Sequence, residues 1–379
     1  MSIVIIGAGV LGASAAFYLA RSGARVTVID AHLDGRATAA GAGIICPWVS
    51  GVEDEAFYRL YVSGGEYYPE LNTALAEAGE TDFGYRRVGA LLVSGDKHEL
   101  AWIERMARQR TAVAMGDVTS LSSTEARELF PPLRQNLGGV HVAGGARVDG
   151  RRLAAALLRA AGSLGASIVH GHAAVAVAAG RVIGVDVVGG EHIPADRVIV
   201  AAGAWADQVL RTMGLSLAVE PQRGQIVHLR LEGVETEDWP VLLPPGSHYI
   251  VPFGGGRIVA GATRETRIGF DYRVTASGQQ EVLSEALRIA PGLSEATMIE
   301  TRVGFRPVGA EVRPLLGWMP GIEGLVVGSG LGAAGLTMGP FAGRLLADLV
   351  TGQPGLMDLA PFDPARRPSS AASAPGALR

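Results

Sequence analysis

The chain opens with two short hydrophobic runs that flank a helical pattern. Residues 2–6 and 25–29 are apolar runs of strand length, and the apolar residues between them recur at helical spacing. Four further strand-length runs, joined by glycine turns, lie at 167–170, 174–178, 182–188 and 197–201. Glycine-rich strand and helix patterns return after residue 323. This order predicts an α/β domain that is assembled from separated parts of the chain.

A different pattern occupies the segments in between. Runs at 224–230, 248–252 and 257–261 indicate strands of a mostly antiparallel sheet, and residues 279–289 indicate a helix. We therefore expect an interleaved α+β domain that faces the substrate. The expected boundaries are 1–85, 145–220 and 301–363 for the first domain, and 86–144 and 221–300 for the second. Residues 364–379, rich in Pro, Ser and Ala, are expected to form a disordered tail.

Helix signals refine this pattern at three places. Residues 53–77 carry apolar side chains at helical spacing, and we expect one or two helices with a break near residues 64–65. Residues 122–125 resemble a capping box that opens a short helix. Asp149 is expected to cap a helix over residues 151–164.

Composition narrows the class of protein. A length of 379 residues suits two domains, and a net charge of −4 argues against a nucleic-acid partner. The single cysteine, Cys46, excludes an internal disulfide and fits a reducing cytosol. No apolar run is long enough to cross a membrane, and no cluster of His, Asp or Glu indicates a metal site. We therefore expect a soluble cytoplasmic protein. The sequence leaves its oligomeric state open, and a homo-oligomer is one of the possibilities.

The first hydrophobic run ends in a glycine motif, Gly7-Ala8-Gly9-Val10-Leu11-Gly12. Gly7 permits a tight turn, Gly9 lets the backbone approach a pyrophosphate, and Gly12 lets the helix pack closely on the sheet. Asp30 ends the second run, where an acidic side chain can accept hydrogen bonds from ribose hydroxyls. A glycine-rich turn without a ligand is the alternative. The motif predicts an adenine dinucleotide, and leaves NAD and FAD both open.

Two other segments are rich in small residues. The strand 197–201 continues into Ala202-Gly203-Ala204-Trp205, where small residues let the backbone pass close to a cofactor. The loop 36–45 offers small residues, Thr38 and free N–H groups to a phosphate or a ring edge. The first segment resembles the second sequence motif of flavoproteins with two dinucleotide folds, which favours FAD over NAD.

Motifs late in the chain resemble the FAD-dependent D-amino-acid oxidase superfamily, which includes glycine and sarcosine oxidases and D-amino-acid dehydrogenases. Residues 247–252, 261–265 and 303–308 match this family in order and spacing. The resemblance implies a Rossmann-like FAD-binding domain with an interleaved substrate domain. It also implies that Arg306 grips the substrate carboxylate and that the Tyr249 hydroxyl supports it, while His248 is expected to point to the opposite side of the strand.

The resemblance and the glycine-rich segments together give an expected set of FAD-binding residues. In the family the turn at 332–337 runs beneath the flavin, and the following helix N-terminus stabilises the reduced ring. The expected set is Gly7, Gly9, Val10, Leu11, Gly12, Asp30, Ala31, Arg36, Thr38, Ala39, Ala40, Gly43, Ile44, Val175, Ala202, Gly203, Trp205, Arg306, Gly332, Ala333, Ala334, Gly335, Leu336 and Thr337.

The implied reaction is oxidation of the Cα–N bond of a small D-amino acid or glycine derivative. Hydride passes to flavin N5, and the imine is hydrolysed to a 2-oxo acid and ammonia or an amine. The chain departs from its relatives in two ways: Ala333 stands where glycine oxidases can place a second arginine, and Lys97, its only lysine, is far from the strand that carries the oxygen-activating lysine of sarcosine oxidases. Oxygen and a quinone or protein carrier therefore both stay open as electron acceptors. Oxidation of a 2-hydroxy acid and an accessory role in an electron-transfer complex are the alternatives.

Overall fold

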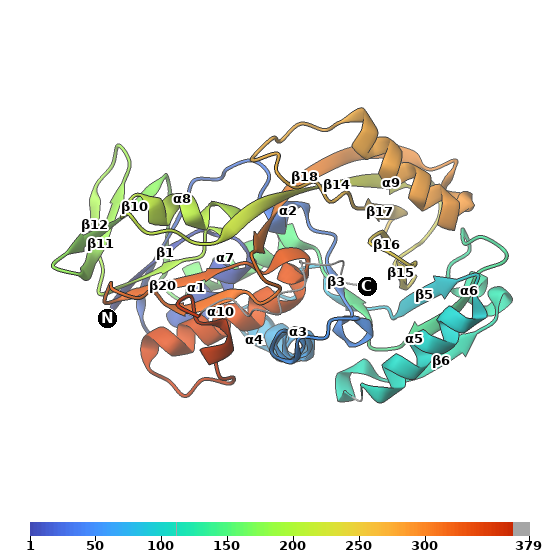
Figure 1. Ribbon diagram of the computed structural model, residues 1–379, viewed down its shortest axis with the longest axis horizontal. Helices are drawn as coiled ribbons and strands as arrows, with labels where there is room; N and C mark the ends of the chain where they lie inside the picture. Colours follow the sequence, from blue (N-terminus) through green and yellow to red (C-terminus); the bar gives the residue numbers. More distant parts are fainter. Residues whose placement is uncertain (111, 367–379) are drawn as a thin grey trace.

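The computed structural model describes residues 1–110 and 112–366 and is built on two large β-sheets (Figure 1). A six-stranded sheet has the order β19-β20-β13-β1-β2-β9, and an eight-stranded sheet has the order β18-β14-β17-β16-β15-β5-β7-β6. In Figure 1 the first lies to the left with its helices, and the second extends to the right along the strands β14 and β18. The prediction of an α/β fold with a separate, mostly antiparallel sheet is confirmed.

The six-stranded sheet is parallel except at its β19 edge, and its central strands β1, β13 and β20 are buried on both faces. Its strands are β1 (Ser2–Ile6), β2 (Arg25–Asp30), β9 (Ser167–His170), β13 (Arg197–Val200), β19 (Leu315–Trp318) and β20 (Leu325–Ser329). Ile3 and Ile5 pack in one core with α1 (Val10–Arg21), α7 (Gly150–Ser163) and α10 (Gly335–Thr351). Val4 and Ile6 pack in another core with β10 (Ala173–Ala178), β11 (Arg181–Val187) and β12 (His192–Pro194). Alternate side chains of β1 thus serve opposite faces.

The eight-stranded sheet is antiparallel except where β15 pairs with β5. Its strands are β5 (Ala90–Ser94), β6 (Val118–Leu121), β7 (Gly138–Val142), β14 (Val219–Arg230), β15 (Val241–Leu243), β16 (Tyr249–Pro252), β17 (Arg257–Gly261) and β18 (Thr297–Gly309). The helices that pack on it are α5 (Lys97–Gln109), α6 (Ser123–Leu129) and α9 (Ala276–Ile289). The pairing of β14 with β18 runs from Val219–Gly309 to Arg230–Thr297 and places Arg306 opposite Gln222.

Short elements connect the two regions. They are α2 (Ala37–Ala40), α3 (Glu55–Glu66), α4 (Tyr68–Glu77), α8 (Ala206–Arg211) and a small sheet of β3 (Ile44–Ile45), β4 (Arg86–Arg87) and β8 (Ala146–Arg147). The helix α3 packs against α10, so this connecting layer contacts the helices of the six-stranded sheet.

Most of the expected elements are confirmed, and the predicted helix break is wrong in position. Asp149 caps α7, and Ser122 and Glu125 form the capping box of α6. The chain breaks at Tyr67 rather than at residues 64–65, which remain in α3. A Cβ atom on Gly64 would lie 2.6 Å from the carbonyl oxygen of Thr337. This glycine therefore serves close packing of two helices rather than a turn.

The domain boundaries stay a prediction, as do the cytoplasmic location and the oligomeric state. Of the expected disordered tail, residues 367–379 lie outside the described residues. Residues 364–366 of the expected tail are described and ordered, and the Arg366 guanidinium donates to the carbonyl oxygen of Arg313 at 2.8 Å. Over the described ranges, no helix is long and apolar enough to cross a membrane.

Candidate functional site

A cavity of about 1400 Å³ lies between the carboxyl ends of the parallel strands and the eight-stranded sheet. Ile6, Asp30 and Ser329, at the ends of β1, β2 and β20, line one part of it. Residues of β14, β16 and β18 line another part. Open α/β sheets bind their ligands at this edge, because the strands end there and the connecting loops diverge.

The glycine turn brings the first strand, the first helix and β13 into close contact. Gly7 has φ +109°, and a Cβ atom there would lie 2.4 Å from the carbonyl oxygen of Ala201. A Cβ atom on Gly12 would lie 2.0 Å from the carbonyl oxygen of Gly7. Only glycine fits either position without moving the backbone, which is the role expected from the spacing.

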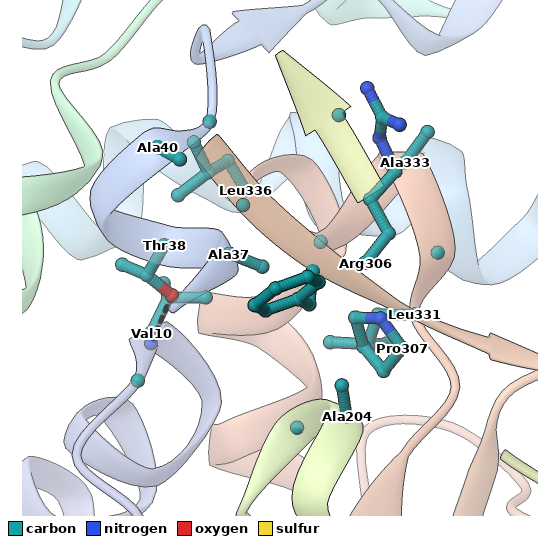
Figure 2. Close-up of a pocket in the computed structure, with 18 of the residues that line it drawn as sticks. Val10, Ala37, Thr38, Ala40, Ala204, Arg306, Pro307, Leu331, Ala333 and Leu336 are labelled. Carbon is teal, nitrogen blue, oxygen red and sulfur yellow. Dashed lines mark hydrogen bonds between the residues drawn. The ribbon is translucent and has the colours of Figure 1, made fainter. Parts of the chain in front are cut away.

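Two side chains from elsewhere in the chain fix this turn. The Asp30 carboxylate accepts backbone N–H groups from Ala8 at 2.6 Å and from His32 at 2.7 Å. The Thr38 hydroxyl accepts the N–H of Val10 at 3.0 Å, as Figure 2 shows. Because each carboxylate oxygen has two acceptor positions, Asp30 can hold the turn and still accept a ribose hydroxyl.

The cavity wall contains most of the residues expected to bind FAD, and Figure 2 shows several of them. Those in the wall are Gly7, Gly9, Val10, Leu11, Asp30, Ala31, Arg36, Thr38, Ala40, Gly43, Ile44, Ala202, Gly203, Trp205, Arg306, Gly332, Ala333, Gly335 and Leu336. Their contacts with the cofactor stay a prediction.

Five residues of the expected set lie behind the wall rather than in it. Gly12 packs on the turn, and the Ala39 carbonyl oxygen accepts a hydrogen bond from Arg151 at 2.8 Å. The Thr337 hydroxyl donates to the carbonyl oxygen of Ile44 at 2.9 Å, which ties α10 to β3. Val175 and Ala334 are buried in hydrophobic cores. These residues support the wall.

Arg306 extends from β18 across the neighbouring strand into the cavity. Its Nη1 donates to the carbonyl oxygen of Thr263 at 3.0 Å. A Cβ atom on Gly224 would lie 2.6 Å from its Nη2 and 2.7 Å from its Nη1. The guanidinium therefore lies flat over Gly224, a residue that the sequence reasoning missed. A glycine inside a strand is a sign of such a close approach.

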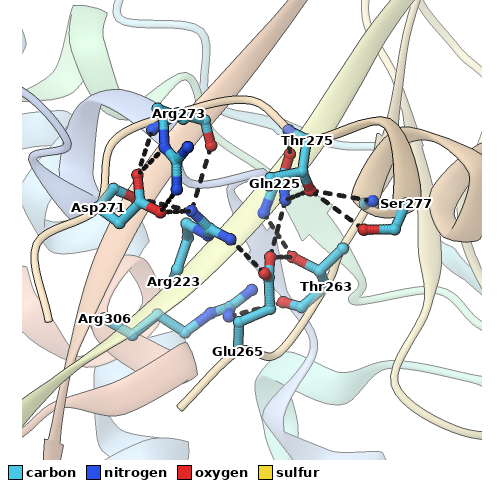
Figure 3. Close-up of polar contacts among 10 residues, drawn as sticks. Arg223, Gln225, Thr263, Glu265, Asp271, Arg273, Thr275, Ser277 and Arg306 are labelled. Atoms are coloured by element: carbon cyan, nitrogen blue, oxygen red, sulfur yellow. Dashed lines mark hydrogen bonds and ion pairs between the residues drawn. The ribbon is translucent and has the colours of Figure 1, made fainter. Parts of the chain in front are cut away.

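Hydrogen bonds among neighbouring side chains hold the Thr263 carbonyl group that accepts from Arg306 (Figure 3). The Glu265 carboxylate accepts from the Thr263 hydroxyl at 2.8 Å and from the Gln225 amide at 2.8 Å. It also pairs with Arg223, which is buried. Burial opposes ionisation of Glu265, but the hydrogen bonds from Arg223, Gln225 and Thr263 prevail and lower its pKa. Arg306 is thus positioned by a charged network of hydrogen bonds.

Tyr249 lies beside Arg306 and presents a neutral hydroxyl. Burial raises the pKa of Tyr249, although the charges of Arg306 and Arg264 act in the opposite direction. The hydroxyl is therefore protonated near neutral pH and can donate a hydrogen bond. His248 also lines the cavity, and its Nε2 lies 3.4 Å from Oε1 of Glu281 in α9, so the structural role expected for it stays a prediction.

Arg264 is a further arginine in the cavity wall, which the sequence reasoning missed. It directly follows Thr263 in a motif assigned to the site, which is the signal that could have identified it. Among the described residues it forms no hydrogen bond, ion pair or ring contact. Those residues also contain no cluster of His, Cys, Asp and Glu that could hold a metal ion.

Cys46 lines the cavity as a buried free thiol. Burial raises its pKa to about 12. At pH 8 the thiolate fraction is therefore about 10⁻⁴, and we expect iodoacetamide to leave the folded protein unmodified. Intact-mass spectrometry measures this, with urea-unfolded protein as the control that gains one adduct. Rapid alkylation of the folded protein, or a mass increase equal to FAD after denaturation, would contradict this environment for Cys46.

The cavity fits a dinucleotide with a ring system. One end has the glycine turn, the N-terminus of α1 and Asp30, and the other end has Arg306, Tyr249 and the turn at 332–335. The helix N-terminus and backbone N–H groups suit a pyrophosphate, and the small residues between the two ends allow a flat ring to lie against backbone.

Comparisons with known proteins identify the family. A family model described as "FAD dependent oxidoreductase" matches residues 2–349. The crystal structure of iminodiacetate oxidase from Chelativorans sp. BNC1 is similar, with 52% identity, a TM-score of 0.93, and coverage of 96% of this chain and 98% of that one. A glycine oxidase of Pseudomonas putida is 31% identical over 96% of this chain and 98% of its own length.

A further relative is an uncharacterized oxidoreductase of Bacillus subtilis, which is 47% identical over 96% of this chain and 98% of its own length. The matches span both large sheets and the cavity between them. The chain belongs to the FAD-dependent oxidoreductase family typified by D-amino-acid oxidase, and it is an FAD enzyme that acts on C–N bonds.

Proposed function

We propose that the protein oxidises the Cα–N bond of a small amine that carries a carboxylate next to the reacting carbon, namely a glycine derivative or a small D-amino acid. The observation that carries this proposal is Arg306. Its guanidinium lies in the cavity wall beside Tyr249, is held by the carbonyl oxygen of Thr263, and has no carboxylate partner among the described residues. Its planar fork matches a carboxylate.

The residues of the chain bind and orient, and FAD supplies the redox chemistry by accepting a hydride from the substrate α-carbon. Arg306 would bind the carboxylate, and the Tyr249 hydroxyl would donate to it. With the carboxylate fixed, the α-carbon has few orientations left, which lowers the entropy cost of reaction. The amine nitrogen loses its proton as the C=N bond forms, and water then splits the imine into a 2-oxo acid and an amine or ammonia.

The relatives support a substrate with a carboxymethyl amine. Glycine and iminodiacetate, which appear in the names of the relatives, both contain a nitrogen bonded to a CH₂ group that bears a carboxylate. Both relatives are named as oxidases, which favours oxygen over a quinone or protein carrier as the electron acceptor. Glycine-type substrates need little space beyond the carboxylate and the nitrogen.

Anaerobic flavin reduction tests the proposal. The purified holoenzyme is mixed with glycine, N-methylglycine, iminodiacetate, D-alanine and 2-hydroxyacetate, and bleaching of the flavin absorbance is followed. We expect at least one of the amines to reduce the flavin, and 2-hydroxyacetate to leave it oxidised. Readmission of oxygen then measures reoxidation. If no amine bleaches the flavin, or if 2-hydroxyacetate alone does, the proposal fails in favour of an accessory flavoprotein or a hydroxy-acid enzyme.

A further inference from the structure

Arg264 differs from the other partly buried arginines near the site. Arg223 pairs with Glu265 and with Asp271, and Arg257 pairs with Asp149. Arg264 is half-buried in the cavity wall, yet no side chain or carbonyl group in the described part of the chain accepts a hydrogen bond from it. A guanidinium with five donors and no acceptor is a costly group to keep out of water.

The charge of Arg306 adds to this cost. Burial and the positive charge of Arg306 both lower the pKa of Arg264, while Tyr249 acts in the opposite direction. Arg264 and Arg306 also both act on the hydroxyl of Tyr249. The two guanidinium groups therefore line the same cavity and act on one hydroxyl group, and the charge of Arg306 disfavours that of Arg264. One carboxylate can satisfy only one fork in bidentate geometry, so a second anionic group is needed to satisfy both.

The acidic side chains in the cavity wall do not fill this role. Asp30 holds the glycine turn, Asp96 caps α5, and the Glu99 carboxylate accepts the Ser94 hydroxyl at 2.7 Å. Arg264 has no charged partner among the described residues, and the space in front of it belongs to the cavity. This arrangement favours a small ligand with two negative charges.

We propose that Arg264 binds a second carboxylate, so that the preferred substrate is a secondary amine with a carboxylate on each arm, an iminodicarboxylate. This inference rests on the proposed function, in which Arg306 holds the carboxylate next to the oxidised carbon. Hydride leaves the CH₂ group of the arm held by Arg306, the nitrogen releases a proton, and the C=N bond forms. Water then cleaves the imine, so that iminodiacetate gives glyoxylate and glycine while FAD is reduced.

The test compares two ligands that differ by one carboxylate. In wild type we expect the ratio of flavin-reduction rate constant to Kd to be higher for iminodiacetate than for N-methylglycine. In Arg264→Met, which keeps an unbranched apolar stem and removes the charge, this value should fall about 10²-fold for iminodiacetate, as expected for one partly buried ion pair. It should change less than about 3-fold for N-methylglycine, because that ligand has nothing to pair with Arg264.

Binding without turnover gives an independent readout. Oxydiacetate has two carboxylates and no oxidisable amine, and methoxyacetate has one, so titration of the flavin spectrum yields their Kd values. Arg264→Met should weaken oxydiacetate about 10²-fold and leave methoxyacetate unchanged. Arg264→Lys should recover part of the loss, because lysine restores the charge without the fork. The control is Arg127→Met, an exposed arginine in α6, for which no change is expected.

Several outcomes would overturn the inference. If Arg264→Met weakened the one-carboxylate and two-carboxylate ligands equally, Arg264 would have a structural role. If the variant lost FAD, Arg264 would bind the cofactor. A wild-type preference for D-aspartate over iminodiacetate would place the second carboxylate on carbon rather than on nitrogen. If N-methylglycine reduces wild type as well as iminodiacetate does, this inference alone fails. If neither amine reduces it, the proposed function fails first.

Discussion

Replacing Arg306 with alanine is expected to slow flavin reduction by a carboxylated amine about 10³-fold while FAD stays bound. The substitution removes a partly buried charge that would form two hydrogen bonds with the substrate carboxylate, and it leaves that carboxylate desolvated without a partner. Stopped-flow measurement of the flavin absorbance at several substrate concentrations gives the rate constant and Kd. Because the glycine turn and Asp30 are unaffected, the FAD content should equal that of wild type.

Two variants sharpen this test. Arg306→Lys should recover only part of the loss, because an ammonium is a point charge and cannot match the carboxylate with two parallel bonds. Arg302→Ala is the control, since Arg302 lies on the same strand but pairs with Glu300 outside the cavity wall. Unchanged substrate affinity in Arg306→Ala, or an equal loss in Arg302→Ala, would refute the assigned role of Arg306.

Local patterns predicted the parts of the fold that depend on local interactions. The strands at 167–170 and 257–261 have the predicted bounds, because their apolar runs end at turn residues. The break between α3 and α4 was misplaced because the packing of Gly64 on Thr337 joins residues far apart in the sequence. Of β14, only residues 224–230 were predicted. Its first part has no apolar run, and it forms a strand because it pairs with β18.

The same division holds for the candidate site. The glycine motif was readable because its spacing is local, although the contact that restricts Gly7 comes from the distant Ala201. The family resemblance supplied Arg306 and Tyr249. Arg264 was missed, because a lone arginine carries no signal until the structure shows that it has no partner. Asp30 was predicted to face ribose, and its bonds to the Ala8 and His32 N–H groups were not foreseen. These contacts follow from tertiary geometry.

The network behind Arg306 explains why its position depends on residues that touch no ligand. The Thr263 hydroxyl accepts the N–H of Gln225 at 2.9 Å and donates to Glu265, which fixes the carbonyl group that receives Arg306 (Figure 3). The register of β14 and β18 then decides where the guanidinium rests. Its resting place is Gly224, so the shape of this one residue controls the position of the charge.

Replacing Gly224 with alanine is expected to slow flavin reduction about 10²-fold, since a displacement of roughly 1 Å can cost that much. The new methyl group would lie 2.6 Å from Nη2 of Arg306 and must push the guanidinium off the strand. The end of a flexible side chain can move without unfolding the sheet, so the melting temperature and FAD content should stay close to wild type. The rate constant and Kd are measured as for Arg306→Ala.

The matched control for Gly224→Ala is Gly162→Ala in α7, where a Cβ atom would meet no atom within 4 Å. This control adds the same methyl group where no neighbouring atom is displaced, and it should leave the rate of flavin reduction unchanged. If Gly224→Ala slows reduction only by displacing the Arg306 guanidinium, the double variant with Arg306→Ala should be little slower than Arg306→Ala alone, because both changes remove the same interaction. Additive losses in the double variant, or wild-type reduction by Gly224→Ala, would show that the guanidinium does not act from its position over this glycine.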